Sequence, residues 1–217
     1  MKALVIGATG ATGKPLVENL LNDPFFEEVI VFVRKAPAAV HEKLIVHVVD
    51  FNAMEQWRDL ITGDVVFSCM GTTIKEAKTK ANQWKIDYEY PYQFAKYAKE
   101  NGCNTHVLVS SYGASSQSRM FYPQMKGKLE EAIKALAYSC NIVFQPGVLI
   151  RKNTDRAMEQ LSVGLIRFLN KLGIYRSYEP LPTEDLASAM IAAAKENTSG
   201  EYVYALDAIR KTWLHKG

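Results

Sequence analysis

Short apolar runs alternate with stretches of helical periodicity along the first two thirds of the chain. The apolar runs cover residues 4–7, 29–33, 44–49, 64–69, 105–110 and 141–145, and helical spacing covers 14–21, 80–100 and 123–138. Several runs are apolar at every position, which indicates strands buried on both faces, as in a parallel sheet covered by helices. The alternation therefore predicts an α/β fold built on a doubly wound parallel sheet.

The rhythm changes after Gly147. Residues 155–172 have apolar side chains at helical spacing, a stripe that belongs either to the core or to a pocket. A further helix is expected over 183–196 and a late strand over 201–205. Because no repeat, linker or low-complexity segment divides the 217 residues, we expect a single domain, with its main sheet in 1–147 and a small helical region in 148–217.

Three glycines, Gly7, Gly10 and Gly13, stand between the first strand and the first helix in the segment GATGATG. In a strand–turn–helix unit the first glycine permits a tight turn, the second lets the backbone approach a pyrophosphate, and the third allows close helix–strand packing. The helix start favours anions, and Thr9 and Thr12 add hydroxyl donors. The segment predicts a dinucleotide site, the alternative being an ordinary glycine-rich turn.

The end of the second strand bears on which dinucleotide binds. An NAD site usually has an acidic residue there for the ribose 2′-hydroxyl. This chain has Arg34 and Lys35, and an arginine can pair with a 2′-phosphate and stack on adenine. We therefore predict NADP(H), the alternative being two solvated charges. After the third strand, Asp50 and Phe51 are candidates to bind and flank the adenine, with a helix N-cap as the other role for Asp50.

Two further turns lie at the carboxyl ends of strands, where open α/β sheets bind ligands. Residues 69–73, CMGTT, close the fourth strand, and Gly71 would let the backbone pass beside the cofactor. Residues 145–149, QPGVL, follow the sixth strand and would turn near the nicotinamide. The candidate cofactor-binding residues are Gly7, Thr9, Gly10, Ala11, Thr12, Gly13, Arg34, Lys35, Asp50, Phe51, Cys69, Met70, Gly71, Thr72, Ser110, Lys126, Pro146, Gly147 and Val148.

Tyr122 and Lys126 form a Tyr-x-x-x-Lys pair at the start of the helix after the fifth strand. At positions i and i+4 their side chains share one helix face, where the ammonium is expected to lower the pKa of the phenol. A serine hydroxyl at the strand end would polarise a substrate carbonyl. We predict Ser111, Tyr122 and Lys126 as the catalytic set and place Ser110 at the cofactor. The alternative is that Ser110 is the catalytic serine and Ser111 faces the cofactor.

The spacing alone does not identify a catalytic pair, because Tyr92 and Lys96 form a second one. That pair lies in the helical stretch 80–100 beside Tyr88, Tyr90 and Phe94, a cluster typical of a packing surface. Only the pair at 122 and 126 follows a strand that ends in serines. Its alternative is a helix-surface pair next to a serine-rich turn.

Composition excludes several classes of function. The 26 basic and 23 acidic residues give a net charge of +3, which does not indicate nucleic-acid binding. No apolar run reaches the roughly 18 residues of a membrane span, and the scattered histidines form no metal-ligand motif. Three widely spaced cysteines, Cys69, Cys103 and Cys140, fit a reducing compartment, so we expect a cytoplasmic protein with buried, unreactive thiols.

In this order, GATGATG, VRK, VVDF, CMGTT, LVSSYGA, Tyr-x-x-x-Lys and QPGVL resemble the atypical short-chain dehydrogenase/reductases, in particular the Tat-interacting metastasis-suppressor-like and NmrA-like group. The resemblance runs from Met1 to about Ala205. It implies a Rossmann fold with bound NADPH, with the glycine turn and Arg34 at the cofactor and Ser111, Tyr122 and Lys126 as the catalytic set. The short C-terminal part speaks against a nucleotide-sugar epimerase.

The leading hypothesis is an NADPH-dependent oxidoreductase that reduces a small carbonyl substrate. Tyr122 would donate the proton, Lys126 would orient the nicotinamide ribose, and Ser111 would hold the carbonyl. The alternative is a non-catalytic NADP(H)-binding redox sensor that docks a protein partner, because the relay asparagine of the larger family has no clear counterpart here. A monomer or homodimer without membrane or nucleic-acid partners is expected.

Overall fold

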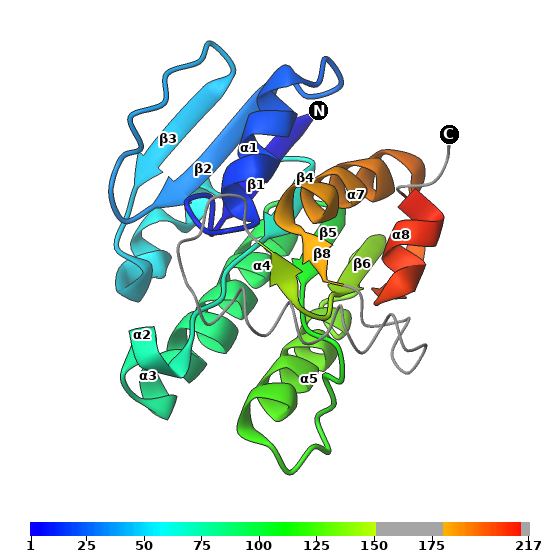
Figure 1. Cartoon of the computed structure of the whole chain (residues 1–217). Coiled ribbons are helices and arrows are strands. Elements are labelled where there is room, and N and C mark those ends of the chain that lie inside the picture. The colour runs from blue at the N-terminus through cyan, green and yellow to red at the C-terminus, as the bar shows by residue number, and fades with distance from the viewer. Residues whose placement is uncertain (151–179, 214–217) are drawn as a thin grey trace.

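Seven strands of the described chain form one parallel sheet (Figure 1). The computed structural model describes residues 1–150 and 180–213. Within these ranges the strand order is β3-β2-β1-β4-β5-β6-β9, which confirms the predicted α/β fold with a doubly wound parallel sheet. The strands are β1 (Lys2–Ile6), β2 (Glu28–Val33), β3 (Leu44–Val48), β4 (Val65–Ser68), β5 (Thr105–Val109), β6 (Cys140–Gln145) and β9 (Gly200–Ala205).

The chain reverses its direction across the sheet at β1. This strand pairs with β2 on one side and with β4 on the other. The chain therefore runs outward from β1 through β2 to β3 and then returns to continue through β4 on the opposite side. Loops diverge at such a switch point, which leaves a crevice beyond the carboxyl ends of the strands.

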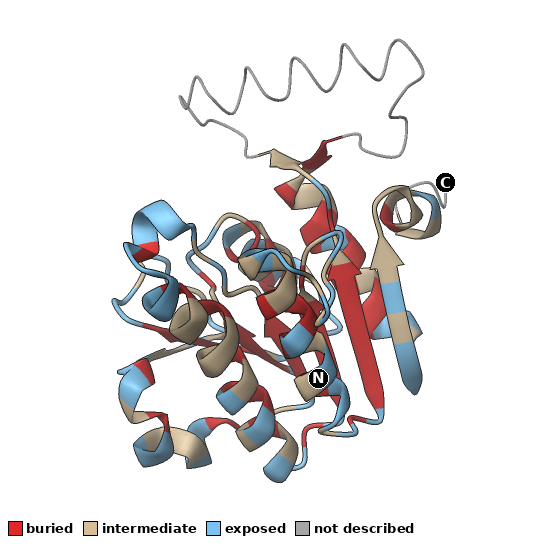
Figure 2. Ribbon diagram, turned by 90° about the horizontal axis from the view of Figure 1, so that it is seen from below, coloured by how far each residue is buried: buried red, intermediate tan, exposed pale blue. Residues whose placement is uncertain are grey.

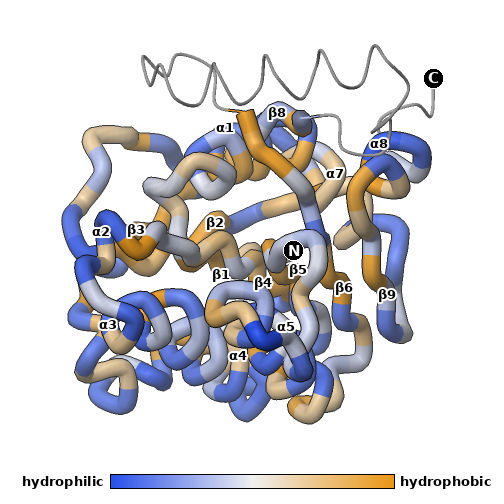
Figure 3. Tube along the Cα trace, turned by 60° about the horizontal axis from the view of Figure 1, so that its bottom comes forward, coloured by the Kyte–Doolittle hydropathy of each residue, from blue (hydrophilic) through white to orange (hydrophobic). Residues whose placement is uncertain are grey.

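Helices cover both faces of the sheet. One face is packed by α1 (Gly13–Asn22), α7 (Thr183–Glu196) and α8 (Asp207–Trp213), and the other by η1 (Phe51–Leu60), α4 (Tyr90–Glu100) and α5 (Phe121–Lys134). Successive residues of β1 pack on opposite faces. Val5 lies in the core under α1, α7 and α8, and Leu4 lies in the core under η1, α4 and α5. Figure 2 shows the buried inner strands, and Figure 3 shows their apolar character between more polar helices. This burial on both faces explains why the strands are apolar at every position.

The last described part of the chain completes the sheet. β9 pairs with β6 from Cys140↔Gly200 to Gln145↔Ala205, and α7 packs against α1. A separate pair of strands is formed by β7 (Leu149–Ile150) and β8 (Leu181–Pro182). Residues 183–205 thus belong to the layers of the main sheet. The amphipathic stripe predicted over 155–172 lies outside the described residues.

The helical stretch expected over 80–100 consists of three joined segments. A π-helical segment, η2 (Lys85–Glu89), separates α3 (Lys80–Trp84) from α4. Such π segments inside a helix are frequent at functional sites. The helix expected over 123–138 is α5, which is shifted toward the N-terminus, and the short helices η1, α2 (Ile74–Ala77) and α8 were not predicted.

His106 on β5 makes the fold sensitive to acid. It is fully buried, and neither ring nitrogen has a hydrogen bond of normal geometry to any of the described residues. Burial lowers its pKa from 6.5 to about 4, and the neighbouring Asn141 offsets only part of this effect. As the pH falls from 6.5 toward 4, the unfolded state binds a proton that the folded state excludes, so the free energy of unfolding drops by about 3 kcal/mol.

Chemical denaturation between pH 7.5 and pH 4.5 tests this expectation, with His106→Phe as the variant. The loss of stability on acidification is expected to be markedly smaller in the variant than in the wild type. His47→Phe is the matched control, because His47 lies partly exposed on the edge strand β3. Equal acid sensitivity of His106→Phe and the wild type would contradict the assignment.

Candidate cofactor and active site

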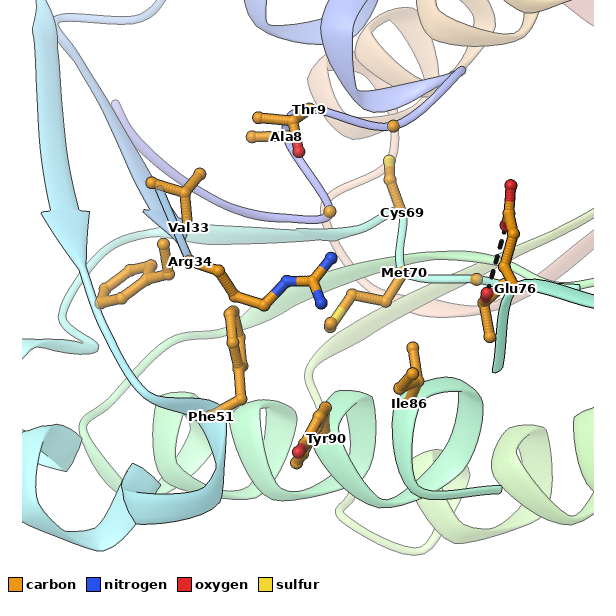
Figure 4. Close-up of a pocket in the computed structure, with 15 residues that line it drawn as sticks. Ala8, Thr9, Val33, Arg34, Phe51, Cys69, Met70, Glu76, Ile86 and Tyr90 are labelled. Carbon is orange, nitrogen blue, oxygen red and sulfur yellow. Dashed lines mark hydrogen bonds between the residues drawn. The ribbon is translucent and has the colours of Figure 1, made fainter. Parts of the chain in front are cut away.

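A cavity of about 460 Å³ opens at the carboxyl ends of β1, β2 and β4, where the sheet changes direction. Figure 4 shows Arg34 reaching into it from the end of β2, with Phe51 and Tyr90 on one side and Ala8 and Thr9 on the other. The lining residues are Gly7, Ala8, Thr9, Gly10, Phe32, Val33, Arg34, Phe51, Cys69, Met70, Gly71, Thr72, Glu76, Ile86 and Tyr90.

Backbone contacts inside the turn after β1 explain two of its glycines. Gly7 has a φ of +76°, and a Cβ there would lie 2.5 Å from the carbonyl carbon of Cys69. A Cβ on Gly13 would lie 2.0 Å from the carbonyl oxygen of Gly7. Gly10 differs, because its Cβ would lie 3.1 Å from that oxygen and 4.0 Å from the next atom, the Cys69 carbonyl oxygen. Gly7 and Gly13 therefore fold the turn, and Gly10 leaves space at the cavity.

Helix α1 begins directly behind this turn. Thr12 is its N-cap residue, the Thr12 side chain makes no cap hydrogen bond, and the first turn has no acidic residue. The N–H groups and the positive end of the helix dipole are therefore not occupied by a side chain. A pyrophosphate fits these donors, with the exposed Thr9 on the cavity wall as a further hydroxyl.

Arg34 and two aromatic rings enclose the opposite end of the cavity. The Phe51 and Tyr90 rings lie 5.5 Å apart, and the Tyr90 hydroxyl donates to Asn52 Oδ1 at 2.8 Å. Arg34 is exposed and takes part in none of the ion pairs found among the described residues. A guanidinium facing flat apolar rings is suited to an adenine and to a phosphate beside it.

Two residues predicted near the adenine lie outside the cavity lining. Asp50 is the N-cap residue of η1, and its Oδ1 accepts from the backbone N–H of Asn52 at 2.9 Å. This contact supports the N-cap role that the sequence left open. Lys35 is exposed next to Arg34 and does not line the cavity.

Residues 69–73 form the third wall, and two buried side chains hold them. Asp87 Oδ1 accepts from the Thr72 N–H at 2.8 Å, and Gln83 Nε2 donates to the Thr72 carbonyl oxygen at 3.0 Å. The Thr72 hydroxyl donates to Glu76 at 3.3 Å, the contact drawn dashed in Figure 4. Thr72 is thus fixed through its backbone by α3 and η2, and it brings its hydroxyl to the cavity.

Helix α5 positions the predicted Tyr–Lys pair. Lys126 is 2% exposed, whereas Tyr122, one turn earlier, is 37% exposed. Gly127 lets this helix approach the preceding loop, since a Cβ there would lie 2.3 Å from the Ser115 carbonyl carbon. Lys126 interacts electrostatically with Cys69, which lines the cavity. The pair therefore combines a buried amine with a phenol that reaches solvent.

The pKa of Tyr122 departs from the prediction. Partial burial raises it to about 12, and the carboxylate of Asp87 acts in the same direction. The expected lowering by Lys126 is wrong for this structure. The reason is that desolvation and the Asp87 carboxylate both favour the neutral phenol, while the Lys126 amine has Asp87 and Glu130 as its own electrostatic neighbours. Tyr122 therefore keeps its proton at neutral pH.

The two serines at the end of β5 differ in their contacts. Ser110 is buried and donates to Glu130, whose pKa is raised by burial. Gln145 Nε2 also donates to Glu130, at 3.0 Å and 2.9 Å to its two oxygens. Within residues 1–150 and 180–213, the Ser111 hydroxyl makes just one side-chain hydrogen bond, a long one of 3.4 Å to the Tyr112 carbonyl oxygen. Ser110 is thus engaged within the fold, while Ser111 has a hydroxyl available for a ligand.

The turns after β5 and β6 lie side by side. The Tyr112 N–H donates to the Pro146 carbonyl oxygen at 2.9 Å. Gly147 is exposed and Val148 half-buried beyond it, and none of these residues lines the cavity described above. The structure thus brings the Ser111 segment and the predicted 145–149 turn to the same end of the sheet.

Nine of the predicted cofactor-binding residues line the cavity, and the others do not. Sequence reasoning missed Ala8, Phe32, Val33, Glu76, Ile86 and Tyr90 on the wall. Ile86 and Tyr90 stand at i and i+4 and therefore share one helix face. That spacing was the signal in the sequence that could have placed both on the cavity wall. The buried carboxyl groups of Asp87 and Glu130 gave no signal in the sequence, because acidic residues in helices are usually solvated.

The three cysteines are free thiols. Burial raises the pKa of Cys69 and of Cys103 to about 12, so neither is a thiolate at neutral pH. Among residues 1–150 and 180–213, no group of three or more His, Cys, Asp or Glu side chains is arranged to hold a metal ion. In the same ranges, no helix has the length and apolar character needed to cross a membrane.

The fold and the glycine turn define a dinucleotide-binding Rossmann protein. A family model described as NAD(P)H-binding matches residues 7–148, and the chain belongs to this family. Its curated relatives include Protein FMP52-1, mitochondrial, of Scheffersomyces stipitis, 33% identical over 204 residues, which are 91% of this chain and 89% of that protein. Protein FMP52, mitochondrial, of Saccharomyces cerevisiae is 35% identical over 182 residues, 82% of this chain and 78% of that protein.

Solved structures show the same fold at low sequence identity. UDP-glucose 4-epimerase of Thermotoga maritima, solved with UDP-glucose, is 14% identical with a TM-score of 0.70, over 95% of this chain and 76% of that one. WbmH of Bordetella bronchiseptica, solved with NAD⁺, is 14% identical with a TM-score of 0.71, over 94% and 74%. The resemblance to the atypical short-chain dehydrogenase/reductases is confirmed, as is NAD(P) binding on an oxidoreductase-like fold.

The predicted cytoplasmic location is corrected by the relatives. The FMP52 proteins of three yeasts carry the word mitochondrial in their names. The prediction depended on three unpaired cysteines, which indicate a reducing compartment and do not identify it.

Proposed function

We propose that the protein is an NADPH-dependent oxidoreductase that reduces a small carbonyl compound through Ser111, Tyr122 and Lys126. The observation that carries this proposal is the position of Lys126. A lysine that is 2% exposed is costly to bury, and this one stands one helical turn after Tyr122 on α5 and interacts electrostatically with Cys69, which lines the cofactor cavity. Such perturbed groups concentrate at functional sites.

Each of the three residues has a distinct part in the reaction. Bound NADPH would supply the hydride. Tyr122 keeps its proton at neutral pH and reaches solvent, so it is suited to donate that proton to the carbonyl oxygen. Ser111 offers the hydroxyl that would hold the same oxygen, because Ser110 is bonded to Glu130. Lys126 would hold the ribose and supply positive charge beside the developing alkoxide.

Screening tests this activity directly. NADPH oxidation is followed by absorbance with a panel of aldehydes, ketones and quinones, after NADPH binding has been measured by calorimetry. Turnover of at least one compound is expected. Tight NADPH binding together with no turnover across the panel would contradict the reductase and favour the redox sensor, for which a partner with redox-dependent affinity would be the positive evidence.

A preference for NADPH over NADH is the second part of the proposal. It is supported by Arg34, whose guanidinium lies in the cavity with no carboxylate paired to it in the described residues. Arg34→Ala is expected to weaken NADPH binding about 10- to 100-fold, since a hydrogen bond to a charged group contributes about 1.5–3 kcal/mol. NADH binding should change much less.

Lys35→Ala is the matched control for this prediction. Lys35 carries the same charge one residue later but does not line the cavity. Calorimetry with both cofactors should show a small effect of this variant. Equal losses for NADPH and NADH in Arg34→Ala would show that Arg34 does not bind the 2′-phosphate.

A further inference from the structure

Asp87 is the buried charged group nearest the site that the proposed mechanism does not use. It is 0% exposed and lies in the π-helical segment η2. Its Oδ1 accepts from the Thr72 N–H at 2.8 Å, while Oδ2 has no hydrogen-bond partner among the described residues. A buried carboxylate oxygen without a partner is costly, so a role for its charge is indicated.

Two elements packed against η2 bring polar and titratable groups to this carboxylate. Lys126 and Tyr122 of α5 interact with it electrostatically, and the Gln83 side chain of α3 lowers its pKa through hydrogen bonding. Glu130 and Cys69 act on Lys126, and Glu76 bonds to the same Thr72 that Asp87 holds. The buried cation in this set is Lys126.

We infer that Asp87 is a positioning residue, whose buried carboxylate, anchored on Thr72 in the 69–73 wall of the cofactor cavity, keeps the buried Lys126 amine protonated. The inference rests on the proposed function. One Asp87 oxygen holds Thr72, and the charge of the carboxyl group opposes the loss of a proton from Lys126. Without that charge, burial would favour the neutral amine, which can still hydrogen-bond a ribose hydroxyl but offers no positive charge to a developing alkoxide.

The electrostatics of the pair agree with this geometry. Burial lowers the pKa of Lys126, and Asp87 is the largest influence that raises it again. Burial raises the pKa of Asp87 to about 6, and Lys126 opposes that change. Asp87 is therefore ionised at neutral pH and gains a proton as the pH falls below 6, at which point it no longer supports the charge of Lys126.

Asp87→Asn separates the two functions of the side chain. The amide oxygen can still accept from Thr72, but the negative charge is gone. NADPH affinity is expected to change less than about threefold, while kcat falls at least tenfold at pH 7. The wild-type kcat should also decline below pH 6, and this acid limb should be missing in Asp87→Asn. Glu89→Gln, an acid-to-amide change in the same segment, is the control expected to leave both readouts unchanged.

A readout that needs no substrate tests the inference apart from the proposed function. The pKa of Lys126 is measured by NMR of protein labelled with ¹³C-lysine, with the signal assigned through Lys126→Arg. A decrease of at least one pH unit in Asp87→Asn is expected, and in the wild type an inflection of the signal near pH 6. An unchanged Lys126 pKa and no inflection would overturn the inference, even in a protein that reduces carbonyls. If no carbonyl compound in the panel is reduced, the proposed activity is wrong, but the Lys126 pKa measured by NMR still decides whether Asp87 supports the charge of Lys126.

Discussion

Gly13→Ala is expected to abolish NADPH binding and to lower the melting temperature substantially. The added Cβ would lie 2.0 Å from the Gly7 carbonyl oxygen and 2.9 Å from the Ala8 Cα, both backbone atoms that no side-chain rotation can move away. The start of α1 must shift, which displaces the turn that the phosphates need. An overpacking cost of about 3 kcal/mol corresponds to a decrease of roughly 6–12 °C for a chain of this size.

Gly10→Ala is the matched control, three residues earlier in the same turn. Its Cβ would lie 3.1 Å from the Gly7 carbonyl oxygen and 4.0 Å from that of Cys69, so the fold should melt within a few degrees of the wild type. The methyl group would instead occupy the cavity side of the turn, and NADPH affinity should fall about 10- to 100-fold. Differential scanning fluorimetry and calorimetry on both variants separate folding from binding. Normal NADPH affinity in Gly13→Ala would contradict this account of the turn.

The sheet and the glycine turn were predictable because local pattern decides both. β2, for example, is apolar at five successive positions, because β1 and β3 pair with its two edges and helices cover both of its faces. Such a strand has the same pattern wherever it lies in the sheet. The contacts of Gly7 and Gly13 are likewise made within the turn and with the neighbouring Cys69, so a short segment contains most of the information.

The buried charges were not predictable, because packing between distant segments creates them. Asp87 stands in the segment KIDYE, where a carboxylate fits an ordinary solvated helix face. It becomes buried only because α5 and the 69–73 loop close over η2. The direction of the Tyr122 pKa was wrong for the same reason: the sequence places Lys126 one turn away but does not reveal the carboxyl groups of Asp87 and Glu130 beside it.

Tyr122→Phe is expected to reduce kcat for any carbonyl substrate by about 10²- to 10⁴-fold, the usual contribution of a positioned general acid. NADPH affinity should stay within twofold, because Tyr122 does not line the cofactor cavity. Stability should also change little, since the side chain is 37% exposed. Turnover with the wild-type enzyme must be found first, and steady-state kinetics on the same substrate then measure the loss.

Tyr92→Phe is the control that the chain itself provides. Tyr92 and Lys96 repeat the Tyr-x-x-x-Lys spacing, but the Tyr92 ring stacks on Tyr88 at 6.2 Å and is not part of the cavity lining. Its kcat should equal that of the wild type. Full activity in Tyr122→Phe would exclude the phenol as proton donor, whereas equal losses in both variants would mean that the tyrosines act through packing. A loss confined to Tyr122→Phe would show that a Tyr-x-x-x-Lys pair is catalytic only where its helix brings the pair to the carboxyl ends of the strands.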